Sequence, residues 1–131
     1  MRRFLRCEKG SEMTEAALTL PVMLFILMAV INLGYMAYEA QVAQAAARHG
    51  ARMASVAQGA GNQIAIAQSE AAAVASSTLG RRFAGVEASG SGPGGTVKVT
   101  VRASVPQWLA GFKFLFPSQV KGTAFFRAEG W

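Results

Sequence analysis

The sequence is poor in the residue types that catalysis and metal binding need. Its 131 residues include no aspartate, a single histidine and a single cysteine, Cys7. One cysteine excludes an intramolecular disulfide and a multi-cysteine metal site, and the carboxylates Glu70, Glu87 and Glu129 stand isolated in the sequence. No Ser/His/Asp or Cys/His arrangement can be assembled from this set. We therefore expect that the protein is not an enzyme, has no cofactor and no metal ion, and uses His49 structurally.

Acidic residues are also scarce, and their shortage leaves the chain basic. Lysine and arginine number 13 against 7 aspartate and glutamate, so the formal net charge is +6. Four basic residues stand near the N-terminus, and the others are scattered without the interleaved aromatic residues that single-strand nucleic-acid binders use. We therefore expect no nucleic-acid partner and no small-molecule substrate.

One stretch of the chain lacks formal charge altogether. The run Ala16–Tyr38 has 23 residues, or about 35 Å of helix, which is enough to cross a bilayer. The basic residues before it favour a cytoplasmic N-terminus and an exported C-terminal part. A cleaved secretory signal peptide, with cleavage near Ala37 or Ala40, is the alternative. Against it, the run is longer than a normal apolar signal region, and Glu12 and Glu15 stand directly before it.

The residues ahead of the uncharged run follow a recognisable spacing. Gly10 ends a short basic leader, Ser11 follows it, and Glu15 is the fifth residue after the glycine. This spacing resembles the class III signal of type IV prepilins and pseudopilins, which a membrane aspartic peptidase cleaves after the glycine on the cytoplasmic side. The resemblance implies a processing site at Gly10 and Ser11. The predicted parts are a cytoplasmic prepilin-type leader at 1–10, a transmembrane helix at 11–38, and a periplasmic helical stalk with a small C-terminal α+β domain at 39–131.

The resemblance extends further along the chain. Three segments are similar to the pattern of the TadE-like family of minor pseudopilins: Glu15 to Pro21, Asn32 to Gly34, and Ala46 to Arg52. The family implies a structural or assembly component of a tight-adherence (Tad/Flp) type IV pilus, single-pass in the bacterial inner membrane. The implied partners are a prepilin peptidase, other pilins or pseudopilins, the inner-membrane pilus assembly platform and membrane lipid. The alternative is an uncleaved, signal-anchored periplasmic binding or sensing module.

Glu15 is the candidate for charge pairing during assembly. Cleavage would give Ser11 a new α-amino group, largely cationic near neutral pH, and Glu15 supplies the opposite charge. A carboxylate in apolar surroundings is tolerated when it pairs with a neighbouring subunit's ammonium and is costly when it does not. In the alternative interpretation, Glu15 only ends the membrane segment in the headgroup region. Pro21 removes one backbone hydrogen bond and should kink the helix unless its neighbours compensate, and an ordinary tolerated proline is the alternative.

The pattern stays helical after the uncharged run. Residues Glu39 to Gln58 have helical periodicity, and Gln63 to Leu79 predict a second helix that ends at Gly80. The first of these helices has one face of small residues that could pack closely against another helix: Ala43, Ala47, Gly50, Ala51 and Ala54. The neighbour is either a helix of another pilin or this chain's own sheet.

The C-terminal part predicts a small antiparallel sheet of two or three strands, and so an α+β fold. Thr96–Val105 alternates apolar and polar residues, Gln119–Glu129 is expected to pair with it, and Phe83–Ala88 is a short candidate strand. The connection before the last strand contains four aromatic residues that either cover the sheet or contact a partner: Trp108, Phe112, Phe114 and Phe116.

Overall fold

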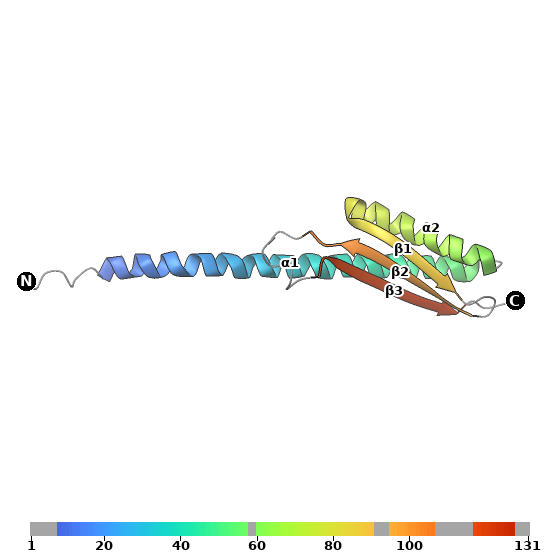
Figure 1. The fold of residues 1–131 in the computed structure, drawn as a ribbon, viewed down its shortest axis with the longest axis horizontal. Helices are drawn as coiled ribbons and strands as arrows, with labels where there is room; N and C mark the ends of the chain where they lie inside the picture. The colour runs from blue at the N-terminus through green and yellow to red at the C-terminus, as the bar shows by residue number, and fades with distance from the viewer. Residues whose placement is uncertain (1–7, 58–59, 91–94, 107–116, 128–131) are drawn as a thin grey trace, which may run out of the picture.

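The computed structural model describes residues 8–57, 60–90, 95–106 and 117–127. Two long helices and three strands follow one another along this part of the chain (Figure 1). The elements are α1 (Glu8–Val56), α2 (Ala60–Leu79), the short 3-10 helix η1 (Gly80–Arg82), β1 (Phe83–Gly90), β2 (Thr96–Ser104) and β3 (Gln119–Arg127). The predicted α+β class, with a long N-terminal helix, a second helix and a small antiparallel sheet, is confirmed.

The longest element, α1, is one helix of 49 residues, about 74 Å long at 1.5 Å per residue. The uncharged run and the predicted exported helix are therefore parts of a single element. Figure 1 shows its N-terminal half projecting beyond α2 and the sheet, which lie beside its C-terminal half. Pro21 lies inside α1, and the helix continues through it.

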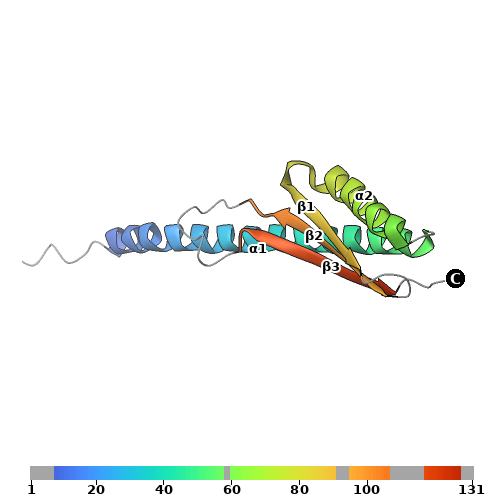
Figure 2. The same cartoon turned by 45° about the vertical axis from the view of Figure 1, so that its right-hand side comes forward.

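The sheet has the strand order β1-β2-β3, and both pairings are antiparallel. In the central strand, the predicted alternation holds: Val97, Val99, Val101 and Ala103 are buried, whereas Thr96 and Lys98 are exposed. Both helices pack against this apolar face and against each other. Figures 1 and 2 show α2 beside β1 and α1 behind β2 and β3, so the other face of the sheet is turned toward the viewer.

The core is built from small side chains. Its helical part consists of alanines of both helices: Ala43, Ala46, Ala47, Ala51, Ala54, Ala67, Ala71 and Ala75. A Cβ atom at Gly50 would lie 2.6 Å from the carbonyl oxygen of Ala67 and 2.7 Å from the Cβ of Ala71. The predicted face of small residues is therefore buried inside this chain, where it lets α1 approach α2 closely.

The boundaries of the elements differ by a few residues from the predicted ones. The helix α2 begins at Ala60, although Gln63 was the predicted start. Gln63 instead lies one turn inside the helix, is buried, and donates a hydrogen bond from Nε2 to the carbonyl oxygen of Ala57 at 3.1 Å. This bond joins the first turn of α2 to Ala57, directly after the end of α1. As predicted, α2 ends before Gly80, which has a φ of +54°.

Candidate functional site

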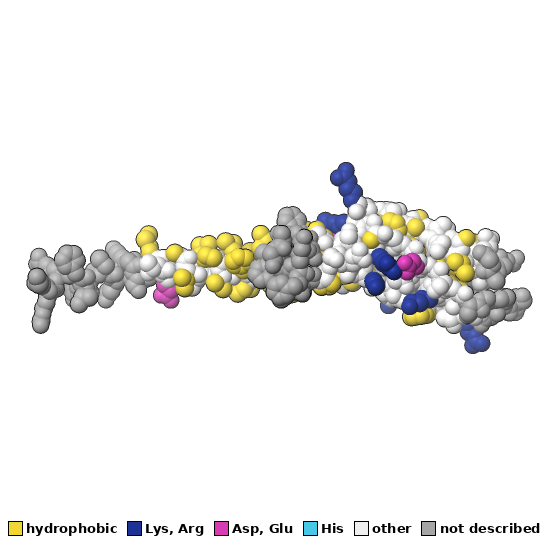
Figure 3. Space-filling view, viewed as in Figure 1, with side chains coloured by type: hydrophobic (Ala, Val, Ile, Leu, Met, Phe, Trp, Pro, Cys, Tyr) yellow, Lys and Arg dark blue, Asp and Glu magenta, His cyan; other side chains and the backbone are white. Residues whose placement is uncertain are grey.

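The N-terminal half of α1 presents large apolar side chains on all sides. The exposed residues along it include Leu18, Leu20, Met23, Leu24, Phe25, Ile26, Leu27, Val30 and Leu33. Within the described residues, α1 is the one helix long and apolar enough to cross a membrane. Because each large apolar side chain gains about 1.5–3 kcal/mol on leaving water, lipid is the natural surrounding for this half. The helix fits a single-pass membrane protein (Figure 3).

The predicted processing and pairing residues lie at the start of this half. The backbones of Gly10 and Ser11 belong to the first turn of α1, and Glu15 is exposed one turn later. The hydroxyl of Thr19 donates to the carbonyl oxygens of Glu15, at 3.0 Å, and of Ala16, at 3.3 Å. Glu15 forms no ion pair with any described residue of its own chain, which leaves its carboxylate available to a partner.

A polar cluster marks the point where α1 enters the folded domain. The Glu39 side chain is completely buried, and its Oε1 accepts a hydrogen bond from Nη1 of Arg82 at 3.1 Å. The Arg82 guanidinium lies 5.5 Å from the centroid of the Tyr35 ring, and Ser104 Oγ donates to the Arg82 carbonyl oxygen at 3.0 Å. These contacts tie α1 to η1 and to the end of β2.

Sequence reasoning missed this cluster, because it treated Glu39 only as the residue that follows the uncharged run and begins the next helical segment. The helical repeat contains the signal that could have found it. Glu39 is four residues before Ala43 and therefore lies on the same face as the buried small residues. Asn32 precedes Glu39 by seven residues, or two turns, and is also buried. Within the described residues, Asn32 Oδ1 and Glu39 Oε2 have no hydrogen-bond partner. Each of these two oxygens could therefore accept a further hydrogen bond.

Beside this cluster, the surface of α1 is hollowed where Gly34 has no side chain. A shallow, open depression of about 400 Å³ is lined by Ile31, Gly34, Tyr35 and Tyr38. A Cβ atom at Gly34 would meet nothing within 4 Å. The depression therefore lies at the C-terminal end of the predicted membrane run, where the exposed apolar half of α1 adjoins the folded domain.

A second polar link joins α1 to the edge of the sheet. Gln44 Nε2 donates to the carbonyl oxygen of Thr123 at 2.7 Å, and the Thr123 amide donates to Gln44 Oε1 at 3.0 Å. Because β3 is an edge strand, the amide and carbonyl groups on its free edge would otherwise lack a strand partner. Next to this link, a Cβ atom at Gly122 would overlap the backbone of Ala43 and Gln44. The glycine thus lets α1 lie directly against β3.

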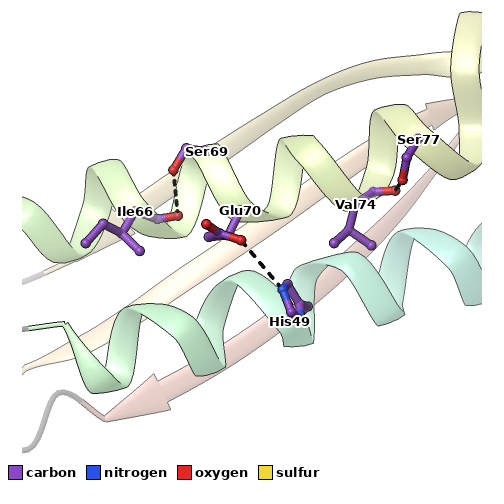
Figure 4. Close-up of polar contacts among 6 residues, drawn as sticks. All are labelled: His49, Ile66, Ser69, Glu70, Val74 and Ser77. Atoms are coloured by element: carbon purple, nitrogen blue, oxygen red, sulfur yellow. Dashed lines mark hydrogen bonds and ion pairs between the residues drawn. The ribbon is translucent and has the colours of Figure 1, made fainter.

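Two of the acids that stand isolated in the sequence, Glu70 and Glu87, have basic partners in the structure. His49 Nε2 lies 3.7 Å from Glu70 Oε2 across the interface of α1 and α2 (Figure 4). Glu87 pairs with Nη2 of Arg102 at 2.8 Å. Residues distant in sequence meet because α2 lies along α1 and because β1 pairs with β2. Among the described residues, no group of three His, Cys, Asp or Glu side chains could hold a metal ion.

The aromatic connection was predicted to cover the sheet or to contact a partner. Trp108, Phe112, Phe114 and Phe116 all lie outside the described residues. The candidate site therefore consists of two described regions. These are the residues predicted for processing and pairing at the start of α1, and the polar cluster around Glu39.

Comparison with known proteins gives one match. The model of the family described as TadE-like protein matches residues 10–52, which begin at Gly10, include the whole uncharged run and end in the packed half of α1. The resemblance to the TadE-like family is thereby confirmed, and it supports a component associated with a Tad pilus, with pilin-type partners. Comparisons with curated proteins and with solved structures gave no match.

Proposed function

From the match of residues 10–52 to the TadE-like family, we propose that this chain is a minor pseudopilin-like structural component of a tight-adherence (Tad/Flp) pilus. It is processed by a prepilin peptidase after Gly10 and has no enzymatic role. It sits in the bacterial inner membrane with a cytoplasmic N-terminus and a periplasmic domain, where its further partners are other pilins and the assembly platform.

What supports this function above all is the division of a single helix. The processing motif stands at its N-terminus, an exposed apolar half of membrane-spanning length follows, and the C-terminal half is packed into a folded domain. A subunit that is held in a membrane and then drawn into a filament needs this division, because one apolar surface must suit both lipid and neighbouring helices.

The position of the processing site also suits cleavage. Gly10 and Ser11 lie in the first turn of α1, where backbone amides have no hydrogen-bond partner within the helix. Unwinding this turn for a peptidase therefore costs few hydrogen bonds. Glycine further lowers the cost, because it loses more conformational freedom in a helix than any other residue.

Glu15 is proposed to pair with the Ser11 ammonium of a neighbouring subunit. Its carboxylate is exposed on a helix whose surroundings are otherwise apolar. In lipid or in a filament core, an unpaired carboxylate is costly and an ion pair offsets that cost. Pairing would therefore be favoured in the assembled state.

The test is the mature N-terminus, measured by mass spectrometry of membrane fractions from cells with and without the prepilin peptidase. A peptide that begins at Ser11 only in the presence of the peptidase is the expected result, and Gly10→Ala should abolish it. An intact N-terminus would replace the proposal with an uncleaved membrane-anchored module. A cut near Ala37 or Ala40 would indicate a secreted protein.

The role of Glu15 requires a separate measurement. Glu15→Ala should leave processing intact and reduce the amount of the subunit that co-purifies with pilin-type partners. Glu12→Ala is the matched control, since it removes a carboxylate one turn earlier and should leave co-purification unchanged. Equal losses in the two variants would contradict a specific pairing role for Glu15.

A further inference from the structure

The face of the sheet that points away from the helices is strongly basic. Among the described residues, the charged side chains of this face are Lys98 and Arg102 of β2, Lys121 and Arg127 of β3, and one acid, Glu87 of β1. We propose that this outward face binds an acidic surface on a different, laterally neighbouring protein chain. The inference goes beyond the pilus role and rests on it for the placement of the domain beside the membrane.

The strand register shows how these charges gather. Residues of β2 that alternate with the buried valines must lie on the outward face, and each has a direct partner on β3. Lys98 is opposite Phe125, Arg102 is opposite Lys121, and Thr96 is opposite Arg127. Figure 3 shows this side of the molecule, where several basic side chains surround one acidic side chain.

The pairing of Arg102 with Lys121 is unfavourable within the chain itself. Like charges directly opposite each other on neighbouring strands destabilise a sheet, by up to about 1 kcal/mol. Glu87 offsets part of this on the β1 side, where it contacts Arg102 at 2.8 Å. No described residue forms an ion pair with Lys98, Lys121 or Arg127. An acidic partner would relieve this repulsion, so the face favours binding of negative charge.

An exposed aromatic ring stands among these cations. Phe125 is 65% exposed, and Lys98 Nζ lies 5.6 Å from the centroid of its ring. Aromatic residues surrounded by a polar rim are typical of protein interfaces. The combination of an apolar centre and a basic rim favours a protein surface over a simple anion.

A second copy of the same chain is a poor occupant, because the exported part has few acids to offer. Residues 39–131 contain 9 lysine and arginine and 4 glutamate, which gives 9 − 4 = +5. Glu39 is buried, Glu70 lies beside His49, and Glu87 already contacts Arg102. The fourth, Glu129, lies outside the described residues. Two such domains would repel each other through these faces.

The lipid surface is also a poor occupant, given the proposed membrane placement. The strands lie alongside the C-terminal half of α1 (Figure 2). With the N-terminal half across the bilayer, the outward face is therefore directed parallel to the membrane plane and not toward the lipid. The packed half of α1, from Glu39 to Val56, is about 27 Å long. The face therefore lies at the height where domains of neighbouring membrane-anchored subunits meet.

The first experiment measures binding to a defined acidic polypeptide. The full chain in non-ionic detergent is titrated into fluorescent poly-L-glutamate, and anisotropy is recorded at two salt concentrations. The triple variant Lys98→Gln/Lys121→Gln/Arg127→Gln should lose at least tenfold in affinity. The control Arg48→Gln/Arg52→Gln/Arg81→Gln removes the same charge from exposed residues elsewhere and should change affinity less than threefold. Equal losses in the two variants would overturn the proposal.

Two further probes distinguish the other anionic occupants. Single-stranded DNA and nanodiscs rich in anionic lipid are titrated under the same conditions. Binding of either one that is tighter than binding of poly-L-glutamate, and that depends on the same three residues, would overturn the choice of a protein partner.

The second experiment identifies the occupant in cells. A photo-crosslinking residue replaces Thr100, which lies at the centre of the outward face opposite Thr123. The expected adduct joins a different chain through an acid-rich segment and disappears in the triple variant. An adduct with a second copy of this chain, or no adduct, would overturn the proposal. The N-terminus is scored in the same cells, so a failure of processing is recognised separately from a failure of this face.

Discussion

The two halves of α1 belong to one helix but follow opposite packing rules. In the N-terminal half, leucine, methionine, phenylalanine and isoleucine side chains are exposed on all sides. In the C-terminal half, the buried residues are almost all alanine and glycine. The large apolar residues of this helix thus lie outside, whereas the residues buried in its packed half are nearly all small.

This difference shows what each half of the helix must accommodate. A helix surrounded by lipid keeps large apolar side chains because they fit the bilayer without a specific partner. A helix that packs against a second helix and a sheet of its own chain needs small side chains, because they allow the backbones to approach. The size of a side chain therefore decides which residues of α1 are buried within the protein, and hydrophobicity alone does not identify the core.

The largest effect is expected from replacing a glycine that packs against the C-terminal half of α1, compared with a glycine that has open space around it. Gly122→Ala places a Cβ atom against the backbone of Ala43 and Gln44, and we expect it to lower the free energy of unfolding by about 3 kcal/mol. Gly34→Ala, in the membrane half of α1, meets nothing within 4 Å and should leave stability unchanged or slightly higher. Thermal unfolding in detergent, followed by circular dichroism, measures both variants. Equal stability of the two would contradict the assignment of close packing to one half only.

The second test concerns the junction between the halves. Arg82→Met leaves the buried carboxylate of Glu39 without its cation, and we expect a loss of about 2 kcal/mol, reduced from a fully buried pair because Arg82 is partly exposed. Glu39→Met combined with Arg82→Met should recover most of this loss. Urea unfolding of the single and double variants measures the coupling, and Arg81→Met is the exposed control. Additive effects of the two substitutions would show that the pair is not coupled.

A third, smaller test examines the link between α1 and the sheet edge. Gln44→Ala removes two hydrogen bonds to Thr123 and should cost about 1–2 kcal/mol. Hydrogen exchange of the Thr123 amide should accelerate, because its acceptor is lost. The exposed Gln41 provides the control variant, Gln41→Ala, for which neither quantity should change. Unchanged exchange at Thr123 in Gln44→Ala would show that the strand edge is protected by other means.

The smallest expected effect is at the contact between His49 and Glu70. Both side chains are partly exposed and lie 3.7 Å apart, so the contact should contribute less than about 0.5 kcal/mol. Glu70→Gln preserves the shape of the side chain and removes its charge. The urea midpoint of this variant should match that of the unchanged protein at both low and high salt. A loss above about 1 kcal/mol would mean that this interface depends on charge as well as on small residues.

The sequence predicted the elements whose residue pattern is local. The alternation in β2 and the small-residue face of α1 repeat with the period of a strand and of a helix, and the uncharged run of α1 is continuous in the sequence. The structure has all three. The start of α2 was predicted at Gln63, later than its start at Ala60, because no local pattern shows that the Gln63 side chain bonds back to the carbonyl oxygen of Ala57.

The contacts that the sequence did not predict join residues far apart in the chain. Glu39 meets Arg82 across 43 positions, and Gln44 meets Thr123 across 79. No local pattern states which cation or which strand edge will lie beside α1, because this follows only from how α1, α2 and the sheet pack. The alternation of apolar and polar residues in β2 was visible in the sequence. That Lys98 lies opposite Phe125 and Arg102 opposite Lys121 follows only from the strand register.

The continuity of α1 from Glu8 to Val56 has a geometric consequence. Because no loop interrupts the helix, the domain rotates together with the membrane half of α1. The rotation of that half about the helix axis therefore determines to which side of the axis the domain points. Insertion of one residue between the two halves would turn the domain by about 100° and raise it by about 1.5 Å. Insertion of seven would return it nearly to its original direction, about 10 Å higher. The number of residues in the helix thus sets the direction from which a neighbour is met.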